Sequence, residues 1–274
     1  MSPELDQKYQ ALKRDIAAME SVIVAFSGGI DSSLVAYVAA EALGRACLAV
    51  TSGSASLKRS DLKLAGELAE KWDMQHRVIV TDELSKPDYR ANPTNRCFHC
   101  KTSLYQALAD IAREDGFAHV LNGTNIDDLG DHRPGLVAAT DFGVRSPLVD
   151  AGFAKTDIRA LAEHLKLENA QKPQSACLSS RFPYGTHIDE ARLAQVESAE
   201  NVLAELGFTQ YRVRHHEDVA RLEIAEDELP RALELRERLQ DAIKACGYRF
   251  VALDLAGFRS GSLNEGVIEI VNVG

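Results

Sequence analysis

The sequence has no apolar run that approaches the roughly 20 residues of a membrane-spanning helix. Its first 20 residues are charged and helical in pattern, unlike a secretory signal peptide. We therefore expect a cytoplasmic protein with no membrane partner. Positive charge is also scarce, since 31 Lys and Arg face 41 Asp and Glu for a net charge of −10. This balance argues against a nucleic-acid partner, although it leaves room for a local basic groove.

Cysteine is scarce too, with five in 274 residues. In a reducing compartment these do not form a disulfide framework. Cys47 and Cys246 lie in apolar stretches and are interpreted as small core residues. Cys97, Cys100 and Cys177 are left as candidates for chemistry.

The sequence shows no internal repeat and no low-complexity tail, and its length predicts two domains. In the first, strands alternate with helices, which predicts an α/β fold with a parallel sheet. The strands are expected at 22–26, 47–50, 77–80 and 118–121. The helices are expected at 4–19, 33–43, 57–72, 98–114 and 156–167, with a further helix and a short edge segment between 131 and 150. Residues 82–96 are expected to be irregular.

The second domain is predicted to be a smaller α+β unit. An aperiodic loop at 171–187, broken at Pro173, gives domain limits of 1–172 and 173–274. Beyond it we expect helices at 189–206 and 226–245, and strands or extended runs at 208–214, 219–224, 248–255 and 266–271.

The stretch Ser27-Gly28-Gly29-Ile30-Asp31-Ser32-Ser33 joins a predicted buried strand to a predicted helix. It lacks the Gly-Lys-Ser/Thr ending of a Walker A loop and the Gly-x-Gly-x-x-Gly of a dinucleotide site. Glycines that let the backbone approach a ligand, followed by a helix N-terminus, favour an anion such as a phosphate chain. A surface turn that happens to contain two glycines is the alternative.

Two further polar loops, 51–56 and 122–128, follow predicted strands of the same sheet. Ligands of such sheets bind beyond the carboxyl ends of the strands, so we expect the three loops to build one site for a phosphate chain. Asp127 and Asp128 could hold Mg²⁺ against the phosphates, or cap a helix. A resemblance to the PP-loop of the ATP pyrophosphatases implies that the ligand is ATP, and the candidate ATP-binding residues are Ser27, Gly28, Gly29, Asp31, Ser32, Ser33, Gly123, Thr124 and Asp127.

A second decisive stretch is Ala176-Cys177-Leu178-Ser179-Ser180-Arg181-Phe182-Pro183-Tyr184-Gly185-Thr186. A loop cysteine near a cation ionises more readily, and the thiolate is the reactive form. Taken alone, this thiol favours a half-buried structural role.

Ser27 to Ser33 resembles the PP-loop of the ATP pyrophosphatases, which cleave ATP between the α and β phosphates. Together with residues 122–128 and the Cys177 stretch, the chain resembles the LarE family over essentially its full length. These are ATP-dependent sulfurtransferases of nickel-pincer nucleotide biosynthesis. The resemblance implies that a carboxylate of pyridinium-3,5-biscarboxylic acid mononucleotide is adenylylated and attacked by Cys177, the catalytic residue. The cysteine then gives up its sulfur and becomes dehydroalanine. Partners would be this small molecule and other enzymes of the pathway, and a homo-oligomer is expected.

The source of the sulfur also depends on a second cysteine motif, Cys97-Phe98-His99-Cys100. Two cysteines alone suit a metal, a redox pair or no function, and they cannot complete a zinc site. Some LarE-like proteins carry this pair together with the loop cysteine and are thought to hold a [4Fe-4S] cluster. The resemblance therefore favours Cys97, Cys100 and Cys177 as cluster ligands, with sacrifice of Cys177 as the competing route.

The nucleotide phosphate of the substrate needs cations. Arg212 and Arg214 alternate on one predicted strand face, as an anion clamp would require. Ser180 and Arg181 could join them from the loop, although any one of these arginines could be an ordinary surface residue. The candidate ligands of a divalent ion are Asp31, Asp128, Glu200 and Glu223, of which the glutamates could simply be solvated.

Three rival functions stay open. A tRNA thiolase would need a basic RNA-binding surface, which the net charge disfavours. An amide-forming ligase would need no cysteine. A non-catalytic nucleotide sensor would bind ATP without releasing pyrophosphate.

Overall fold

The computed structural model describes residues 1–130, 134–173, 175–259 and 261–264. The chain divides into two compact units, Met1–Ala176 and Cys177–Gly274, which are described in turn. The predicted α/β class is confirmed, with a parallel sheet in the first unit and a smaller sheet in the second. The division predicted after residue 172 and the roles given to the two domains stay predictions.

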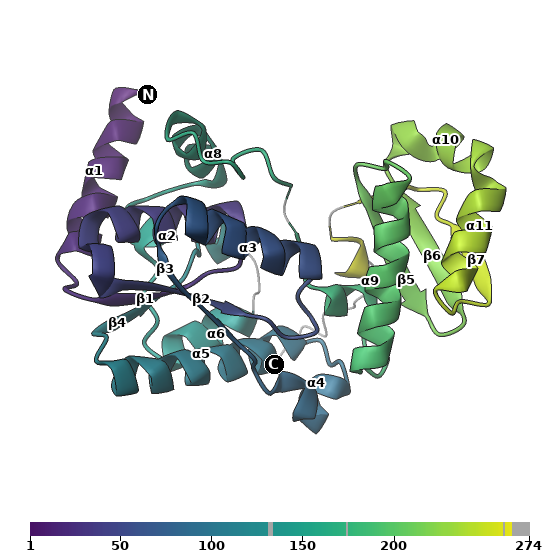
Figure 1. The fold of residues 1–274 in the computed structure, drawn as a ribbon, viewed down its shortest axis with the longest axis horizontal. Coiled ribbons are helices and arrows are strands. Elements are labelled where there is room, and N and C mark those ends of the chain that lie inside the picture. The colour runs from purple at the N-terminus through teal and green to yellow at the C-terminus, as the bar shows by residue number, and fades with distance from the viewer. Residues whose placement is uncertain (131–133, 174, 260, 265–274) are drawn as a thin grey trace, which may run out of the picture. The chain divides into compact units, whose positions relative to one another are not determined.

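A four-stranded parallel sheet forms the centre of the first unit (Figure 1). Its spatial order is β3-β2-β1-β4, and each neighbouring pair is parallel. The strands are β1 Val22–Ala25, β2 Cys47–Ser52, β3 Gln75–Ile79 and β4 His119–Leu121. β1 and β2 are buried on both faces, which is why their sequences are continuously apolar. The predicted edge segment is present as a parallel bridge between Leu121 and Arg145.

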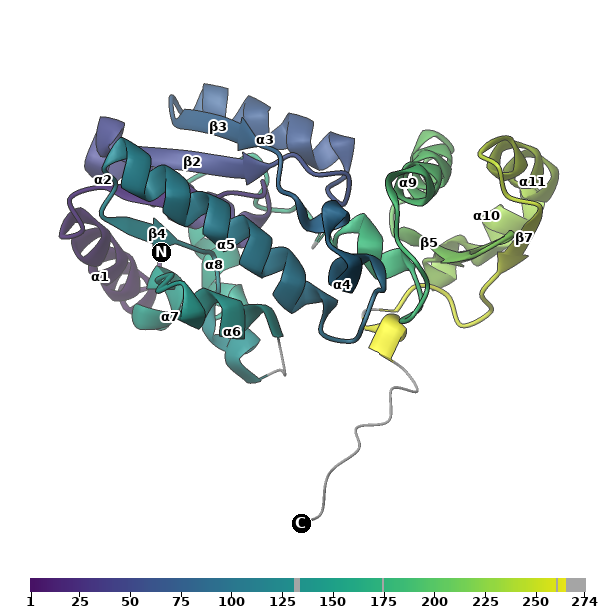
Figure 2. The ribbon, with the colours of Figure 1, turned by 90° about the horizontal axis from the view of Figure 1, so that it is seen from below.

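Helices cover both faces of this sheet (Figures 1 and 2). Val22 and Val24 pack into the cluster formed with α1 Pro3–Ala17, α2 Ile30–Leu43, α3 Arg59–Lys71 and α8 Lys155–His164. Ile23 points the other way, toward α5 Arg96–Asp115 and α6 Pro134–Asp141. The shorter elements are η1 Gly44–Ala46, η2 Glu83–Ser85, α4 Pro87–Arg90, η3 Ile126–Gly130 and α7 Pro147–Asp150.

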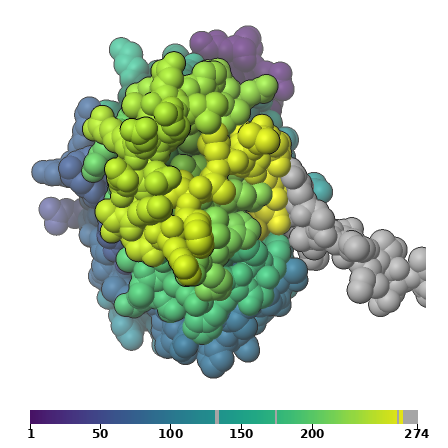
Figure 3. Space-filling model, turned by 90° about the vertical axis from the view of Figure 1, so that its right-hand side faces the viewer, coloured from purple at the N-terminus to yellow at the C-terminus, as the bar shows by residue number. Residues whose placement is uncertain are grey.

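The second unit packs helices on a three-stranded sheet of order β5-β6-β7. β5 and β6 are antiparallel, whereas β6 and β7 are parallel. Leu203, Val213, Leu222 and Ile243 join the helices to the sheet in one buried cluster. The elements are η4 Leu178–Arg181, α9 Glu190–Glu205, β5 Tyr211–His216, β6 Val219–Ile224, η5 Glu226–Glu228, α10 Leu229–Glu234, α11 Arg236–Ala245, β7 Phe250–Leu253 and η6 Ser262–Asn264. In the space-filling view of Figure 3, the segment from α10 to β7 is visible as the yellow-green to yellow part of the surface.

Three expectations need comment. The single helix predicted over 226–245 is wrong: Leu235, with φ −89° and ψ 11°, separates α10 from α11. The irregular stretch 82–96 contains η2 and the four-residue α4, which begins at Pro87, a residue favoured at the first helical position. The extended run predicted at 266–271 lies outside the described residues. None of the described helices has the length and apolar character to cross a membrane.

Candidate active site

The loop between β1 and α2 is shaped by its glycines and serines. Gly28 has a φ of +69°, a left-handed conformation that favours glycine. The Ser32 hydroxyl donates to the Gly29 carbonyl at 3.0 Å and lies 3.1 Å from the Ser27 hydroxyl. Gly29 is the N-cap residue of α2 and provides no side-chain cap. The small hydroxyls thus hold the loop together, and the uncapped helix N-terminus offers N–H groups to an anion.

The loop after β4 touches this first turn of α2. A Cβ atom at Gly123 would lie 2.6 Å from the Ser32 nitrogen, so only glycine fits there. The Asn122 side chain fixes the turn, because its Oδ1 accepts from the Thr124 N–H at 3.0 Å and from the Ser146 hydroxyl at 2.9 Å. The structure therefore brings Gly123 and Thr124 to the loop that begins at Ser27.

The third predicted loop lies beside the first. The Thr51 hydroxyl donates to the Phe26 carbonyl at 2.7 Å, and the Phe26 N–H donates to the Val50 carbonyl at 2.8 Å. Ser54 and Ser56 are buried, with their hydroxyls 2.8 Å apart. All three loops after β1, β2 and β4 thus gather at the carboxyl edge of one sheet.

Lys155 connects two of the candidate carboxylates, and the sequence reasoning missed it. Its ammonium donates to Asp31 Oδ1 at 2.6 Å, and its backbone N–H donates to Asp127 Oδ2 at 2.7 Å. Asp128 Oδ2 accepts from the Asn125 N–H at 3.1 Å. A lysine in the first turn of α8 faces the positive end of the helix dipole, an unfavourable place that could have marked it as functional.

In the second unit, Cys177 precedes η4 and its carbonyl is tightly held. The carbonyl accepts from the Ser180 hydroxyl at 2.8 Å and from Arg181 Nη1 at 3.1 Å. Cys177 itself is only half-buried. The backbone at the cysteine is thereby fixed while the side chain keeps access to solvent.

Arg181 is buried and pairs with a buried glutamate of α9. Its Nε and Nη2 donate to the two carboxylate oxygens of Glu200 at 2.8 and 3.1 Å. Glu200 Oε1 also accepts from the Val213 N–H at 3.1 Å. This two-pronged contact ties the cysteine loop to α9 and β5.

Arg212 and Arg214 share one face of β5, as predicted. Arg214 Nε lies 3.0 Å from Glu223 Oε1, and Arg214 Nη1 donates to the Ser180 carbonyl at 2.6 Å. Arg212 lies over the Phe258 ring at 4.7 Å from its centroid. Burial, with the nearby charges of Arg181 and Arg214, lowers the pKa of Arg212. The structure therefore brings together Ser180, Arg181, Arg212 and Arg214, which we call the arginine cluster.

Glu200 and Glu223 belong to this cluster as partners of its cations. Glu223 is fully buried, and its oxygens receive the Ser262 hydroxyl at 3.2 Å and Arg221 Nη2 at 3.1 Å. Their predicted role as ligands of a divalent ion stays a prediction. The contacts favour the balancing of buried arginine charge instead.

Cys97 and Cys100 stand one helical turn apart at the start of α5, and neither takes part in a disulfide among the described residues. As soft ligands they suit iron–sulfur chemistry. Cys177 belongs to the other unit. Among the residues that the structure describes, no group of three or more His, Cys, Asp or Glu could hold a metal ion. The three-cysteine ligand set therefore stays a prediction.

Comparison with known proteins identifies relatives along nearly the whole chain. A pyridinium-3,5-bisthiocarboxylic acid mononucleotide synthase of Lactiplantibacillus plantarum is 40% identical over 95% of both chains. An uncharacterized protein of Synechocystis is 38% identical over 95% of this chain and 98% of its own. One of Methanocaldococcus jannaschii is 30% identical over 88% and 92%. The chain belongs to the LarE family.

Two further matches each cover less of the chain. The family model described as asparagine synthase covers residues 6–123. An NH₃-dependent NAD⁺ synthetase of Methanococcoides burtonii is 38% identical over only 24% of this chain and 26% of its own. These agree with a nucleotide-binding PP-loop domain shared with amide-forming enzymes. As a LarE-family member, the chain is an ATP-dependent sulfurtransferase, as predicted.

Proposed function

We propose that this enzyme adenylylates a carboxylate of pyridinium-3,5-biscarboxylic acid mononucleotide and converts it to a thiocarboxylate for the nickel-pincer nucleotide. The observation that carries the proposal is the 40% identity, over 95% of both chains, with the synthase of the corresponding bisthiocarboxylic acid. Geometry adds support in each unit. The three loops of the first unit suit a phosphate chain, and the arginine cluster of the second suits a substrate phosphate.

Adenylylation is assigned to the first unit. A substrate carboxylate oxygen attacks the α-phosphorus of ATP, and pyrophosphate leaves. The loop from Ser27 to Ser33 would receive the pyrophosphate on its N–H groups. Lys155 would neutralise phosphate charge if a ligand or Mg²⁺ draws Asp31 away from it. Asp31 and Asp128 are the carboxylates proposed to hold that Mg²⁺.

Substrate binding is assigned to the arginine cluster. Arg181 and Arg214 each have a buried carboxylate within ion-pair distance. Among the described residues, no carboxylate pairs with Arg212. A phosphate monoester would supply negative charge beside it and relieve the mutual repulsion that lowers its pKa. Arg212 is therefore the proposed principal phosphate ligand, with Ser180 beside it.

Sulfur transfer is assigned to Cys177. Its thiolate attacks the carbonyl carbon of the mixed anhydride and expels AMP, which forms a thioester. Loss of the cysteine Cα proton then breaks the Cβ–S bond. This elimination leaves dehydroalanine in the protein and the sulfur in a thiocarboxylate. The mass of the protein falls by that of one H₂S for each carboxylate converted, because the sulfur leaves in the product.

Cys97 and Cys100 support an alternative sulfur source within the same function. With Cys177 they would hold a [4Fe-4S] cluster, which, when bound through only three protein ligands, would supply an open iron for an exogenous sulfide. The thiol chemistry of the pair fits such a group. In that case Cys177 would be a permanent ligand and would survive turnover.

The test is an anaerobic reaction of the protein with ATP, Mg²⁺ and the biscarboxylate mononucleotide, followed by mass spectrometry of product and protein. We expect a sulfur-containing product together with AMP and pyrophosphate. Absence of that product would contradict the proposal. Loss of one H₂S from the protein would identify sacrifice of Cys177. Turnover that needs iron and sulfide, and that Cys97→Ser abolishes, would identify the cluster.

Two variants sharpen this test. Cys177→Ala should abolish the thiocarboxylate yet still release pyrophosphate. An amide-forming ligase, the function that the match to asparagine synthase favours, would keep full activity in this variant. Cys246→Ala is the matched control, because Cys246 also lies half-buried in the second unit and its thiol donates to the Ala242 carbonyl of the adjoining helix α11. It should react as the wild type does.

A further inference from the structure

Asn169 lies far from the phosphate-binding motif in sequence but contacts it directly. It follows α8 and is 3% exposed. Its Nδ2 donates to the Gly28 carbonyl at 3.0 Å and to the Ser33 hydroxyl at 2.7 Å. One carboxamide thus bonds the loop on both sides of its turn into α2.

The orientation of this carboxamide is set by the loop. Both of its bonds use the amide nitrogen, and its Oδ1 is buried without a hydrogen-bond partner among the described residues. A buried oxygen left unpaired is unfavourable, and a side chain selected for packing alone would avoid it. The reversed orientation would place that oxygen against the Gly28 carbonyl. The hydrogen bonds to the loop therefore determine how the Asn169 carboxamide is oriented.

The two bonds restrain the parts of the loop that an anion would meet. Gly28 is buried in its left-handed conformation, and its Cβ position is only 3.4 Å from Ala65 of α3. Ser33 is fully buried in the first turn of α2, where its N–H donates to the Gly29 carbonyl at 2.9 Å. With both points fixed, the N–H groups between them keep their direction before any ligand arrives.

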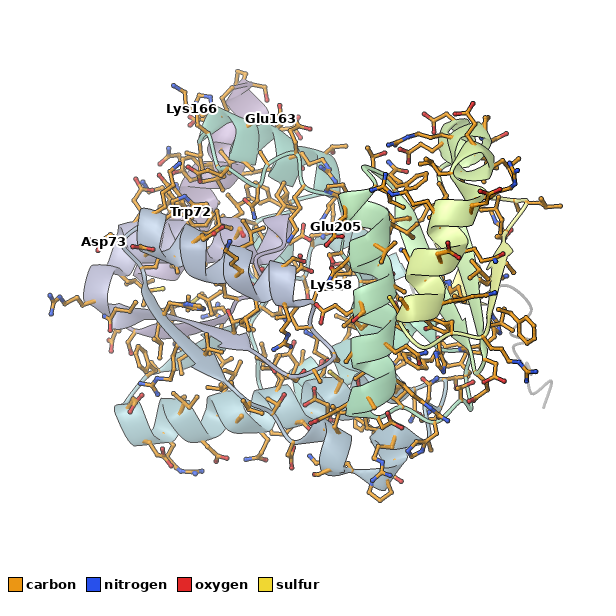
Figure 4. All side chains as sticks on the ribbon, turned by 45° about the vertical axis from the view of Figure 1, so that its right-hand side comes forward. Lys58, Trp72, Asp73, Glu163, Lys166 and Glu205 are labelled. Atoms are coloured by element: carbon orange, nitrogen blue, oxygen red, sulfur yellow. The ribbon has the colours of Figure 1, made fainter. Side chains whose placement is uncertain are left out.

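The segment that carries Asn169 is itself fastened to α3. Lys172 donates to Asp61 Oδ1 at 2.8 Å, and Asp61 is 8% exposed in the first turn of α3. Trp72 lies at the other end of that helix (Figure 4). Its indole donates to Glu168 Oε2 at 2.8 Å. The carboxamide is therefore presented from a rigid support.

We propose that Asn169 is a positioning residue that preorganises the loop from Ser27 to Ser33 for the pyrophosphate end of ATP. It acts through the Gly28 carbonyl and the Ser33 hydroxyl and does not itself touch the nucleotide. This rests on the proposed function only in taking pyrophosphate as the group that the loop receives. Preorganised donors bind an anion more tightly because no ordering is needed on binding.

The experiment compares the affinities of wild type and Asn169→Ala for three probes by titration calorimetry: Mg²⁺-pyrophosphate, Mg²⁺-ATP and AMP. We expect the dissociation constants of pyrophosphate and ATP to rise about tenfold or more, from the loss of two hydrogen bonds that order the loop. That of AMP, which lacks the β and γ phosphates, should change less than about twofold. A residue needed only for folding would not separate AMP from ATP.

Two more variants complete the design. Asn169→Asp keeps the shape, removes the donors and adds negative charge behind the loop, so its loss of pyrophosphate affinity should exceed that of the alanine variant. Gln106→Ala removes an exposed amide of α5 that donates to Asp110 of the same helix, and this variant should bind all three probes as the wild type does.

Unchanged pyrophosphate affinity in both Asn169 variants would overturn the proposal, as would equal losses for AMP and pyrophosphate. If wild-type protein bound no pyrophosphate, the loop would not be a phosphate site and the proposal would fall with it. If pyrophosphate bound but no thiocarboxylate formed in the reaction above, only the proposed function would fail.

Discussion

The loop from Ser27 to Ser33, which we call the phosphate-binding loop after its proposed role, and the arginine cluster, the proposed site of the substrate phosphate, are built by opposite means. The loop relies on backbone N–H groups, a left-handed glycine and small hydroxyls, and its Asp31–Lys155 pair is about a quarter exposed, at 25% and 28%. The cluster relies on guanidinium groups that are almost wholly buried, Arg181 at 3% and Arg214 at 2%. Each of these has a buried glutamate beside it.

The two sites differ in how far apart in the sequence their main components lie. A loop made of backbone groups and hydroxyls needs only its own short sequence, the helix that follows it and a positioning residue such as Asn169. Buried arginines need carboxylates from other elements, because an isolated charge in the interior is costly. We therefore expect the carboxylates of the cluster to be essential for folding and those of the loop to matter for chemistry.

Removal of the Glu200 charge should have the largest effect on stability. Glu200→Gln would leave Arg181 buried without its counter-charge, which costs about 3–5 kcal/mol in comparable pairs. Urea unfolding at neutral pH measures the free energy of unfolding of the variant and wild type. The matched control is Glu205→Gln on the same helix, where the carboxylate is exposed (Figure 4). It should change that free energy by less than about 0.5 kcal/mol. Equal, small effects from both variants would contradict the role given to Glu200.

A methyl group at Gly123 should have the next largest effect, this time in the loop region. Its Cβ would lie 2.6 Å from the Ser32 nitrogen and 2.9 Å from the Asp31 carbonyl carbon, both backbone atoms that cannot rotate away. We expect Gly123→Ala to destabilise the protein by about 1–3 kcal/mol and to weaken ATP binding. Thermal unfolding and nucleotide titration measure the two effects.

Gly66→Ala provides the control for this prediction. Gly66 lies inside α3, and a Cβ there would meet nothing within 4 Å. Alanine favours the helix over glycine, so this variant should gain about 0.5–1 kcal/mol of stability and bind ATP normally. If Gly123→Ala behaved in the same way, the close approach of the two loops would be disproved.

Sequence patterns predicted most of the fold because its signals are local. Continuous apolar runs marked β1 and β2, and the bounds of β6 match the predicted range 219–224. The break at Leu235 could not be foreseen, since no proline or glycine stands there. Leu229, Leu235 and Leu239 all pack on the core of the second unit, so tertiary packing overrides local helical preference.

The candidate site likewise contains some residues that the sequence predicts and others that it does not. The loop from Ser27 to Ser33 could be identified from sequence because its glycines and serines are contiguous. Lys155 and Asn169 were not, since each reaches the loop from a segment more than 120 residues away. The pairing of β5 with β6 places Glu223 opposite Arg212. Local sequence does not predict this pairing, so the sequence suggested a metal ligand at Glu223 and gave no sign of its arginine partners.

Acid should weaken the second unit through His215, which lies on the face of β5 opposite the arginines. Its Nδ1 is 3.0 Å from the Tyr248 hydroxyl, and burial lowers its pKa below the ordinary 6.5. The folded form therefore binds its proton less readily than the unfolded form. Stability from this group is complete above about pH 6.5 and is lost as the pH falls toward the folded pKa, by up to about 1.4 kcal/mol per pH unit.

His215→Phe should reduce this acid sensitivity. Urea unfolding at pH 7.5 and pH 5.5 measures the loss in wild type and variant, and the loss should be smaller in the variant. Between pH 7.5 and pH 8.5, where the histidine is neutral in both states, the two proteins should respond alike. An equal acid loss in both would exclude His215 as the titrating group.

The Asp31–Lys155 pair should show the smallest effect on stability and a large one on chemistry. Because both side chains are partly solvated, Asp31→Asn should lower the free energy of unfolding by about 1 kcal/mol or less. Pyrophosphate release should fall on the order of 100-fold, since a preorganised charge at the reacting phosphates is lost.

The chain offers a closely matched control for this last variant. Lys8 and Asp157 form a pair at 2.7 Å with exposures of 23% and 25%, and this pair also involves α8. Lys8→Met should cost a similar small amount of stability and leave pyrophosphate release intact. Equal activity losses in the two variants would mean that any weakening of α8 impairs the enzyme. Loss in Asp31→Asn alone would locate the chemistry in the phosphate-binding loop, where charge is kept accessible, in contrast to the arginine cluster, where it is buried and balanced.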